Sequence, residues 1–181
     1  MNKVFVGYDP REDIAYQVCK YSIETQSKNV SVHPLKQSEL RSAGWYKRPI
    51  DKLASTEFTF TRFLIPELTN FKGWALFIDC DMILQTDIQE LFDQADDKYA
   101  VMCVKHEYEV KEEFKMDGQK QTVYPRKNWS SVMLFNCEHP ANKRLTQDMV
   151  NSTELNGAYF HRFSWLEDDA QLGELDHTWN Y

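Results

Sequence analysis

Short apolar runs alternate along the chain with longer segments in which apolar residues recur at helical spacing. Runs with the length and composition typical of strands occupy residues 3–8, 29–36, 74–79, 99–104 and 131–136. Helical spacing is found over residues 11–27, 59–68 and 140–151, and a further short helix is expected from Asp87. This succession predicts an α/β fold with a mostly parallel sheet flanked by helices.

Proline and aspartate residues mark the expected ends of these elements. Asp9 or Pro10 can begin the helix after the first strand, and Pro66 is expected to end the second helix. Residues 37–56 are polar and irregular, which predicts a loop with at most a short helix. Residues 105–127 are charged, mixed in sign and poor in aliphatics, so we expect an excursion from the core.

The overall composition fits one soluble domain. A chain of 181 residues without repeats or a visible boundary suits a single core over residues 1–181. The formal net charge of -7 disfavours nucleic acid as a partner, because non-specific nucleic-acid binding needs a basic surface. An acidic protein that handles an anionic diphosphate needs a cation to offset the repulsion, so the charge also fits a metal site.

No targeting signal or membrane span is expected. The apolar start of the chain is only a few residues long, and no apolar run approaches the roughly 20 residues that cross a bilayer. The cysteines are too widely spaced for a CxxC motif and lie mostly in strand-like contexts, where a free thiol packs as a small hydrophobe. We therefore expect a cytoplasmic protein with reduced thiols. The four are Cys19, Cys80, Cys103 and Cys137.

Asp79-Cys80-Asp81 is the motif that carries the chemistry. It follows a nearly continuous apolar run, as expected of a buried parallel strand, and ligands bind beyond the carboxyl ends of such strands. Asp9 lies at a corresponding strand end. Two neighbouring carboxylates repel each other and are costly to desolvate, and a hard divalent cation such as Mn²⁺ or Mg²⁺ resolves both problems. The alternative is a solvated pair that caps the following turn.

Four stretches of the chain resemble, in the same order, segments of glycosyltransferases with the A fold. The closest resemblance is to family 8, which includes glycogenin-like and lipopolysaccharide galactosyltransferase-like enzymes. In that family the DxD segment holds manganese and the donor diphosphate, and the first strand ends at the nucleotide base. The stretches are VFVGYDPRED, STEFTFTRFLIPEL, FIDCDMIL and NWSSVMLFNC.

The resemblance implies roles for individual residues. Asp81 matches the metal ligand, and Asp79 matches the carboxylate that contacts the metal or the ribose. Tyr8 and Asp9 match positions that contact the base. Arg62 matches an arginine that a helix directs toward the nucleotide. Its alternative is a surface arginine paired with one of two nearby glutamates, Glu57 or Glu67.

The donor sugar is expected near two further segments. Asn128, Ser130 and Ser131 match the family's donor-sugar neighbourhood, with a capping or edge-strand polar cluster as the alternative. Glu167-Asp168-Asp169 lies where the family has a PDQD-like segment, but without its proline or glutamine. Asp168 and Asp169 are equal candidates for the catalytic carboxylate at this place. The alternative is an acidic helix N-terminus, which the helix dipole favours.

The last residues depart from the family. The family places a metal-ligating histidine in a late segment resembling HYxGxxKPW, whereas this sequence stops at Tyr181, in a stretch that resembles what precedes that segment. On this resemblance we expect the third ligand to be absent, either because the chain is a C-terminally truncated piece or because it is a minimal member. His177 does not match the missing motif and is expected at the surface, and His161 and His106 lack a ligand context.

The resemblance implies a metal-dependent transferase. Its reaction would move a sugar from a UDP-sugar or similar donor to the hydroxyl of a carbohydrate or other acceptor, with retention of the anomeric configuration. A non-catalytic or fragmentary nucleotide-sugar-binding module is the main alternative. A sugar nucleotidyltransferase is less favoured. Such enzymes hold the triphosphate in a glycine-rich loop after the first strand, whereas the stretch GYDPRED at this place contains a single glycine. The sequence leaves the sugar, the acceptor and the oligomeric state open.

Overall fold

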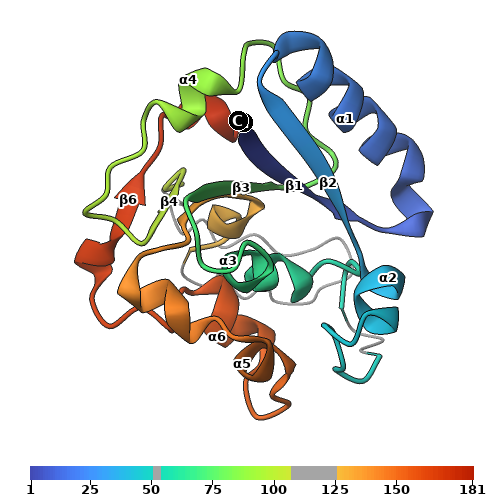
Figure 1. Cartoon of the computed structure of the whole chain (residues 1–181), viewed down its shortest axis with the longest axis vertical. Helices are drawn as coiled ribbons and strands as arrows, with labels where there is room; N and C mark the ends of the chain where they lie inside the picture. The colour runs from blue at the N-terminus through green and yellow to red at the C-terminus, as the bar shows by residue number, and fades with distance from the viewer. Residues whose placement is uncertain (51–53, 107–125) are drawn as a thin grey trace, which may run out of the picture.

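Strands of the described residues form one sheet with helices on both faces (Figure 1). The computed structural model describes residues 1–50, 54–106 and 126–181. Its strands are β1 (Asn2–Tyr8), β2 (Val30–Lys36), β3 (Trp74–Ile78), β4 (Val101–Cys103), β5 (Val132–Asn136) and β6 (Leu172–Glu174). Its α-helices are α1 (Asp13–Gln26), α2 (Gln37–Ser42), α3 (Ile65–Leu68), α4 (Gln89–Phe92), α5 (Gln147–Asn151) and α6 (Gly157–His161).

Short 3₁₀ helices connect several of these elements. They are η1 (Pro10–Glu12), η2 (Thr61–Leu64), η3 (Trp129–Ser131), η4 (Pro140–Arg144), η5 (Asp169–Gln171) and η6 (His177–Trp179).

The sheet is mostly parallel, as the sequence predicts, but one inner strand runs the other way. The strand order is β2-β1-β3-β5-β4-β6, and β1 is parallel to both β2 and β3. β5 is antiparallel to β3 and to β4, while β6 is parallel to β4. The carboxyl ends of β1 and β3 therefore lie at the same edge of the sheet as the beginning of β5.

Helices cover both faces of the sheet, although α1 leaves Ile14, Val18 and Tyr21 exposed. α1 buries Tyr16, Cys19 and Ile23 against β1 and β2, with which it makes its main strand contacts. α3 packs on β3 and β5. Figure 1 shows α1 and α4 on one side of the sheet and α3, α5 and α6 on the other.

Aromatic side chains form the core under α3 and α6. The ring of Phe63 lies 5.2 Å from that of Phe160 and 5.5 Å from that of Trp165, measured between centroids. Trp165 is fully buried, and its indole Nε1 donates to Asn142 Oδ1 at 3.1 Å. The indole thus satisfies its polar atom while burying a large apolar surface.

Several elements differ from the sequence prediction. The helix expected over residues 59–68 is η2 followed by the short α3, and β6 was not predicted. Pro66 occupies the first turn of α3 and does not end the helix, because proline fits where no intrahelical N–H is required. The helix expected over residues 140–151 is divided into η4 and α5, since Thr146 caps a new helix through the Met149 N–H. The five-residue helix α6 was not predicted. Most of the charged segment 105–127, namely residues 107–125, lies outside the described residues.

The burial of the cysteines and the character of the helices bear on two further expectations. All four cysteines are free and buried, so each packs as a small apolar side chain. No helix in the described ranges combines the length and apolar character that a bilayer span requires.

Candidate functional site

Most of the predicted site residues lie at one edge of the sheet. Asp79 directly follows β3, and Asp9 directly follows β1. Because β5 is antiparallel, the segment from Asn128 to Ser131 enters the sheet at this same edge. The Asp79 N–H donates to the Ser131 carbonyl oxygen at 2.9 Å, which joins the DxD motif to that segment. The expected meeting of strand ends thus brings together residues more than fifty positions apart in the sequence.

Arg62 forms an ion pair with Asp79. The guanidinium Nη1 lies 2.9 Å from Asp79 Oδ1, and the two side chains are 6% and 21% exposed. The same Nη1 donates to the Ser130 carbonyl oxygen at 2.8 Å, and Nε donates to the Phe58 carbonyl oxygen at 3.0 Å. Arg62 therefore connects η2 to both the DxD motif and the segment before β5. The alternative of a surface arginine paired with Glu57 or Glu67 is wrong.

Burial opposes charge on both partners of this pair. Burial raises the pKa of Asp79, while the positive charge of Arg62 and a hydrogen bond from the Ser131 side chain counteract that rise. Burial likewise lowers the pKa of Arg62, against the attraction of Asp79. The attraction between the two side chains therefore offsets part of the cost of burying each charge.

Aromatic rings enclose the Arg62 guanidinium. Its central carbon lies 4.5 Å from the ring centroid of Phe77 and 5.2 Å from that of Phe58. The Phe58 ring in turn covers Gly7 at the end of β1, where a Cβ atom would come within 2.6 Å of the ring. The missing side chain at residue 7 thus lets Phe58 approach the strand and pack beside the guanidinium.

Asp81 differs from Asp79 in every one of these respects. Its side chain is exposed, and it forms no side-chain hydrogen bond or ion pair with the described residues. Between the two aspartates, Cys80 is buried and donates to Glu12 Oε2 with a sulfur–oxygen distance of 3.4 Å. The buried cysteine anchors the motif, and the Asp81 carboxylate is left free to contact a ligand.

Asp9 is occupied by contacts within the protein. Its side chain is 1% exposed, and Oδ1 accepts from the Arg11 N–H and Nε at 2.9 Å each. Oδ2 accepts from Arg11 Nη2 at 2.6 Å and from the Glu57 N–H at 3.1 Å. These hydrogen bonds from Arg11 lower the pKa of Asp9 to about 2. Asp9 therefore holds a turn and orients an arginine that is itself exposed.

A cavity of about 250 Å³ adjoins this arginine. Its lining includes Arg11, Gln37, Tyr46 and Glu57, so it lies beyond the ends of β1 and β2. Tyr8, the last residue of β1, is tied by its hydroxyl to Asp13 Oδ1 at 2.9 Å, which raises the pKa of the tyrosine. Polar and aromatic groups thus line a concave surface at the strand ends where the sequence predicts a nucleotide.

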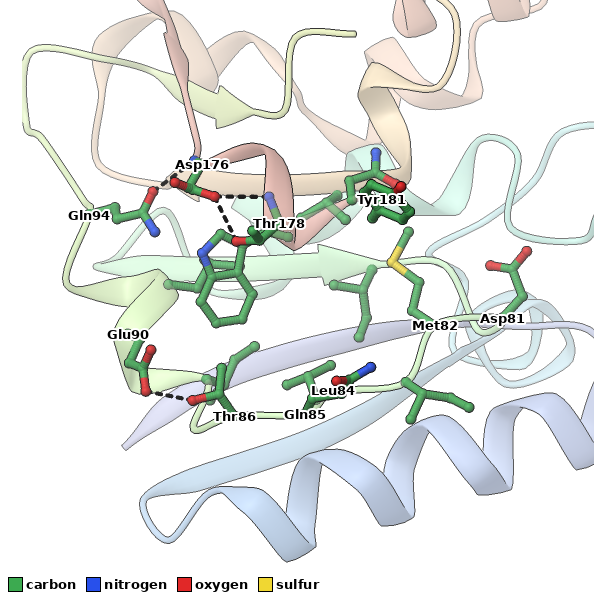
Figure 2. A pocket seen from close by; sticks show the side chains of 17 residues that line it. Asp81, Met82, Leu84, Gln85, Thr86, Glu90, Gln94, Asp176, Thr178 and Tyr181 are labelled. Atoms are coloured by element: carbon green, nitrogen blue, oxygen red, sulfur yellow. Dashed lines mark hydrogen bonds between the residues drawn. The ribbon is translucent and has the colours of Figure 1, made fainter.

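A larger cavity of about 810 Å³ begins at Asp81 (Figure 2). Figure 2 shows Asp81 and Met82 at one end of this cavity and Thr86 with Glu90 at the other. The segment from Met82 to Thr86 forms one wall, and the residues from Asp176 to Tyr181 contribute to another. The exposed carboxylate of Asp81 thus stands at the mouth of a polar and apolar groove.

The two candidate catalytic carboxylates lie outside the Arg62–Asp79 network. Asp168 caps η5 by accepting from the Ala170 N–H at 2.8 Å, and Asp169 forms an ion pair with Arg126 at 2.5 Å. Within residues 1–50, 54–106 and 126–181, no hydrogen bond or ion pair joins either carboxylate to Asp79 or Asp81. The capping contact fits the alternative of an acidic helix N-terminus for Asp168.

The three residues predicted near the donor sugar have different environments. Asn128 is exposed and adopts the left-handed conformation, with φ 64°. Ser130 is buried, and its hydroxyl lies 2.7 Å from Nδ1 of His161. Ser131 contacts Asp79 through its carbonyl oxygen and its side chain. The predicted segment is therefore beside the DxD motif, with Asn128 exposed at its start.

Comparison with known proteins identifies the group to which this arrangement belongs. The sequence profile described as Glycosyl transferase family 8 matches residues 8–180. The chain belongs to glycosyl transferase family 8. It is also 54% identical over 180 residues to Protein CDI of Arabidopsis thaliana, covering 99% of this chain and 68% of that protein.

Solved glycosyltransferases share the fold of this family 8 chain. GlyE of Streptococcus pneumoniae TIGR4 superposes with a TM-score of 0.62 at 16% identity, over 99% of this chain and 46% of GlyE. The galactosyltransferase LgtC, solved with donor and acceptor sugar analogues, gives a TM-score of 0.53 at 10% identity, over 97% of this chain and 73% of LgtC. The family 8 chain therefore spans less than half the length of GlyE.

Sequence reasoning missed several contributors to the site of this family 8 chain. Arg11 and Glu12 fall in the turn after β1, yet no spacing rule shows that they contact Asp9 and Cys80. His161 had no ligand context in the sequence, but it lies against Ser130. His177 is exposed, as expected.

Proposed function

We propose that the chain binds a nucleoside diphosphate sugar, with a UDP-sugar as the favoured donor, and transfers the sugar to an acceptor hydroxyl with retention. The observation that carries this proposal is the pairing of a buried, arginine-held Asp79 with an exposed Asp81 at the end of β3. Membership of glycosyl transferase family 8 supports the same reaction.

A divalent cation, Mn²⁺ or Mg²⁺, fits the groups that are present. Asp79 and Asp81 offer hard carboxylate oxygens of the kind these ions prefer, and phosphate oxygens and water can complete an octahedron. Among the described residues, no three side chains of His, Cys, Asp or Glu come together as a metal site. When bound, the cation would act as a Lewis acid that stabilises negative charge on the departing diphosphate.

The residues around the motif would bind and orient the donor. The cavity at the ends of β1 and β2 would receive the nucleoside, with Arg11 in its lining and with Tyr8 and Asp9 just before that arginine in the chain. In this proposal the base contact passes to Arg11, because the Asp9 carboxylate is already used by that arginine. Arg62 would act by holding Asp79 in place and by keeping the segment before β5 close to the donor.

The sugar would lie beyond the diphosphate. Asn128 and Ser131 are candidates to contact it, since they begin the segment that meets Asp79. Asp168 and Asp169 are the candidate catalytic carboxylates from the sequence. The acceptor would be a carbohydrate or another hydroxyl compound, and loops on a fixed scaffold usually determine such specificity. With retention, the leaving phosphate can take the acceptor proton, so the mechanism needs no separate base.

Calorimetry with UDP tests the site directly. We expect UDP to bind more tightly with Mn²⁺ than without it, and the replacement Asp81→Asn to remove the manganese-dependent gain in affinity. Asp148→Asn is the matched control, because Asp148 is an exposed acid on α5 that lines neither cavity. Binding of UDP that ignores both the metal and the Asp81 replacement would overturn the site.

Turnover needs a second measurement. Incubation with a panel of UDP-sugars should release UDP slowly by hydrolysis, and both Asp168→Asn and Asp169→Asn should be compared with the unchanged chain. If UDP binds with manganese but no donor is cleaved, the chain is a nucleotide-sugar-binding module and the transferase proposal fails.

A further inference from the structure

His161 connects two segments next to the proposed donor site. It is the last residue of α6, and its ring packs edge-on against Phe63 with centroids 5.2 Å apart. Nδ1 lies 2.7 Å from the Ser130 hydroxyl, and the ring also forms a hydrogen bond with the backbone of Thr59. The imidazole therefore joins the segment before η2 to the segment before β5.

The histidine is neutral in this position. Burial, together with the positive charge of Arg62, lowers the pKa of His161 to about 3. A neutral imidazole has one N–H donor and one acceptor nitrogen. Donation to the Thr59 carbonyl leaves Nδ1 to accept from the Ser130 hydroxyl. The ring acts as a fixed pair of hydrogen-bonding groups and carries no charge.

Ser130 and Ser131 pass this constraint to the DxD motif. The Ser130 carbonyl oxygen accepts from Arg62 at 2.8 Å, and Arg62 pairs with Asp79. The neighbouring Ser131 carbonyl oxygen accepts from the Asp79 N–H. Any displacement of Ser130 would therefore alter two of the contacts that fix Asp79.

We propose that His161 is a positioning residue that holds Ser130 in place, and through it Arg62 and Asp79, for metal-dependent nucleotide binding. The inference rests on the proposed function, because it concerns the same site. His161 itself would touch no reacting atom. Its effect would be comparable to that of groups that orient metal ligands from outside the coordination shell, where loss typically weakens metal affinity by about 10–100-fold.

Two replacements of His161 separate hydrogen bonding from packing. His161→Asn places an amide near the position of Nδ1 and can still bond Ser130, but it loses the ring. His161→Phe keeps an aromatic ring against Phe63 and cannot accept from Ser130. We expect His161→Phe to raise the Kd of UDP with Mn²⁺ by about tenfold or more, and His161→Asn to stay within about threefold of the unchanged chain.

Ser130→Ala supplies an independent route to the same interaction. It removes the hydroxyl that Nδ1 contacts while keeping the carbonyl oxygen that Arg62 uses. If the pair acts as a unit, Ser130→Ala should weaken UDP binding as His161→Phe does, and the double variant should be no weaker than either alone. Should His161→Phe fail to fold, Ser130→Ala alone decides the question.

Asn142→Ala controls for a general loss of stability. Asn142 is a buried polar residue that bonds the Ala100 and Asn136 carbonyl oxygens, at the edge of the sheet opposite the end of β3. It should destabilise the fold and leave the Kd of UDP with manganese unchanged.

Three outcomes would decide against the role of His161. It is overturned if His161→Phe binds UDP with manganese as tightly as the unchanged chain. It is also overturned if His161→Asn and His161→Phe lose affinity equally, or if Asn142→Ala loses it in proportion to stability. Failure of the unchanged chain to bind UDP with manganese would instead reject the proposed function.

Discussion

Asp79 and Asp81 are two residues apart in the sequence and have opposite environments. Asp79 is largely buried, faces Arg62, and takes its backbone contact from Ser131. Asp81 is exposed at the mouth of a groove and has no comparable partner among the described residues. The fold thus fixes one carboxylate and leaves its neighbour available to a ligand. Replacement of the two residues should therefore change the free energy of unfolding by different amounts.

Replacement of Arg62, the partner of Asp79, should lower the free energy of unfolding the most. Arg62→Met removes the positive partner and leaves a buried carboxylate without compensation, which costs about 3–5 kcal/mol in free energy of unfolding. Urea denaturation at pH 7 would measure the loss. The double variant Arg62→Met with Asp79→Asn should recover part of it, because the uncompensated charge is gone. An additive double variant would contradict a direct coupling between the two residues.

Replacement of Gly7 would disturb the buried surroundings of Arg62 and Asp79 without changing a charge. Gly7→Ala would force a Cβ into the Phe58 ring beside Arg62, and overpacking of this kind costs about 1–3 kcal/mol. Thermal and urea unfolding would both detect the change. Gly157→Ala is the matched control, since the nearest atom to its Cβ would be 3.7 Å away and its stability should hold or rise. Equal losses at the two glycines would show that the contact with Phe58 does not cause the destabilisation.

The free energy of unfolding should also depend on pH through the buried side chain of His161. The pKa of His161 is lowered to about 3 in the folded chain, so between about pH 6.5 and pH 3 the unfolded chain binds the additional proton. The stability that comes from holding His161 neutral is fully present above pH 6.5 and is lost progressively as the pH falls. From pH 7 to pH 5 this linkage amounts to about 2 kcal/mol. Urea denaturation at both values should show a smaller decline for His161→Asn than for the unchanged chain, and equal declines would refute the linkage.

Asp81 should give the smallest effect on stability. Asp81→Asn changes an exposed side chain without a fixed partner, so its free energy of unfolding should stay within about 0.5 kcal/mol of the unchanged value. Asp79→Asn should differ clearly from this result in the same denaturation experiment, because it removes the partner of a buried guanidinium. Similar stabilities for the two variants would show that the contrast in burial has no energetic weight.

The first half of the fold follows closely from the sequence. β1, α1, β2 and β3 begin and end within a few residues of the predicted bounds, because long apolar runs and regular helical spacing define them. The sequence also places Asp9 and Asp79 at strand ends. The direction of β5 could not be predicted, since a continuous apolar run reads the same for a parallel and an antiparallel strand.

The contacts within the site depend on tertiary structure and left no local signal. Arg62 lies in η2 and Asp79 follows β3, so the two meet only in the folded chain, and the burial of Arg62 is the reverse of what an isolated arginine suggests. The helix α6 is too short to show helical spacing of apolar residues, so the position of His161 beside Ser130 could not be predicted from the sequence. The ligand-binding roles of Tyr8, Asp168 and the other predicted residues stay predictions.

The pairing of β4 with β5 bears on how new specificities can arise on this scaffold. These two strands are antiparallel neighbours, so the chain between them leaves and re-enters the sheet at the edge that carries Asp79. A change of specificity that keeps both strands should therefore leave the strand order as it is and Ser131 beside Asp79.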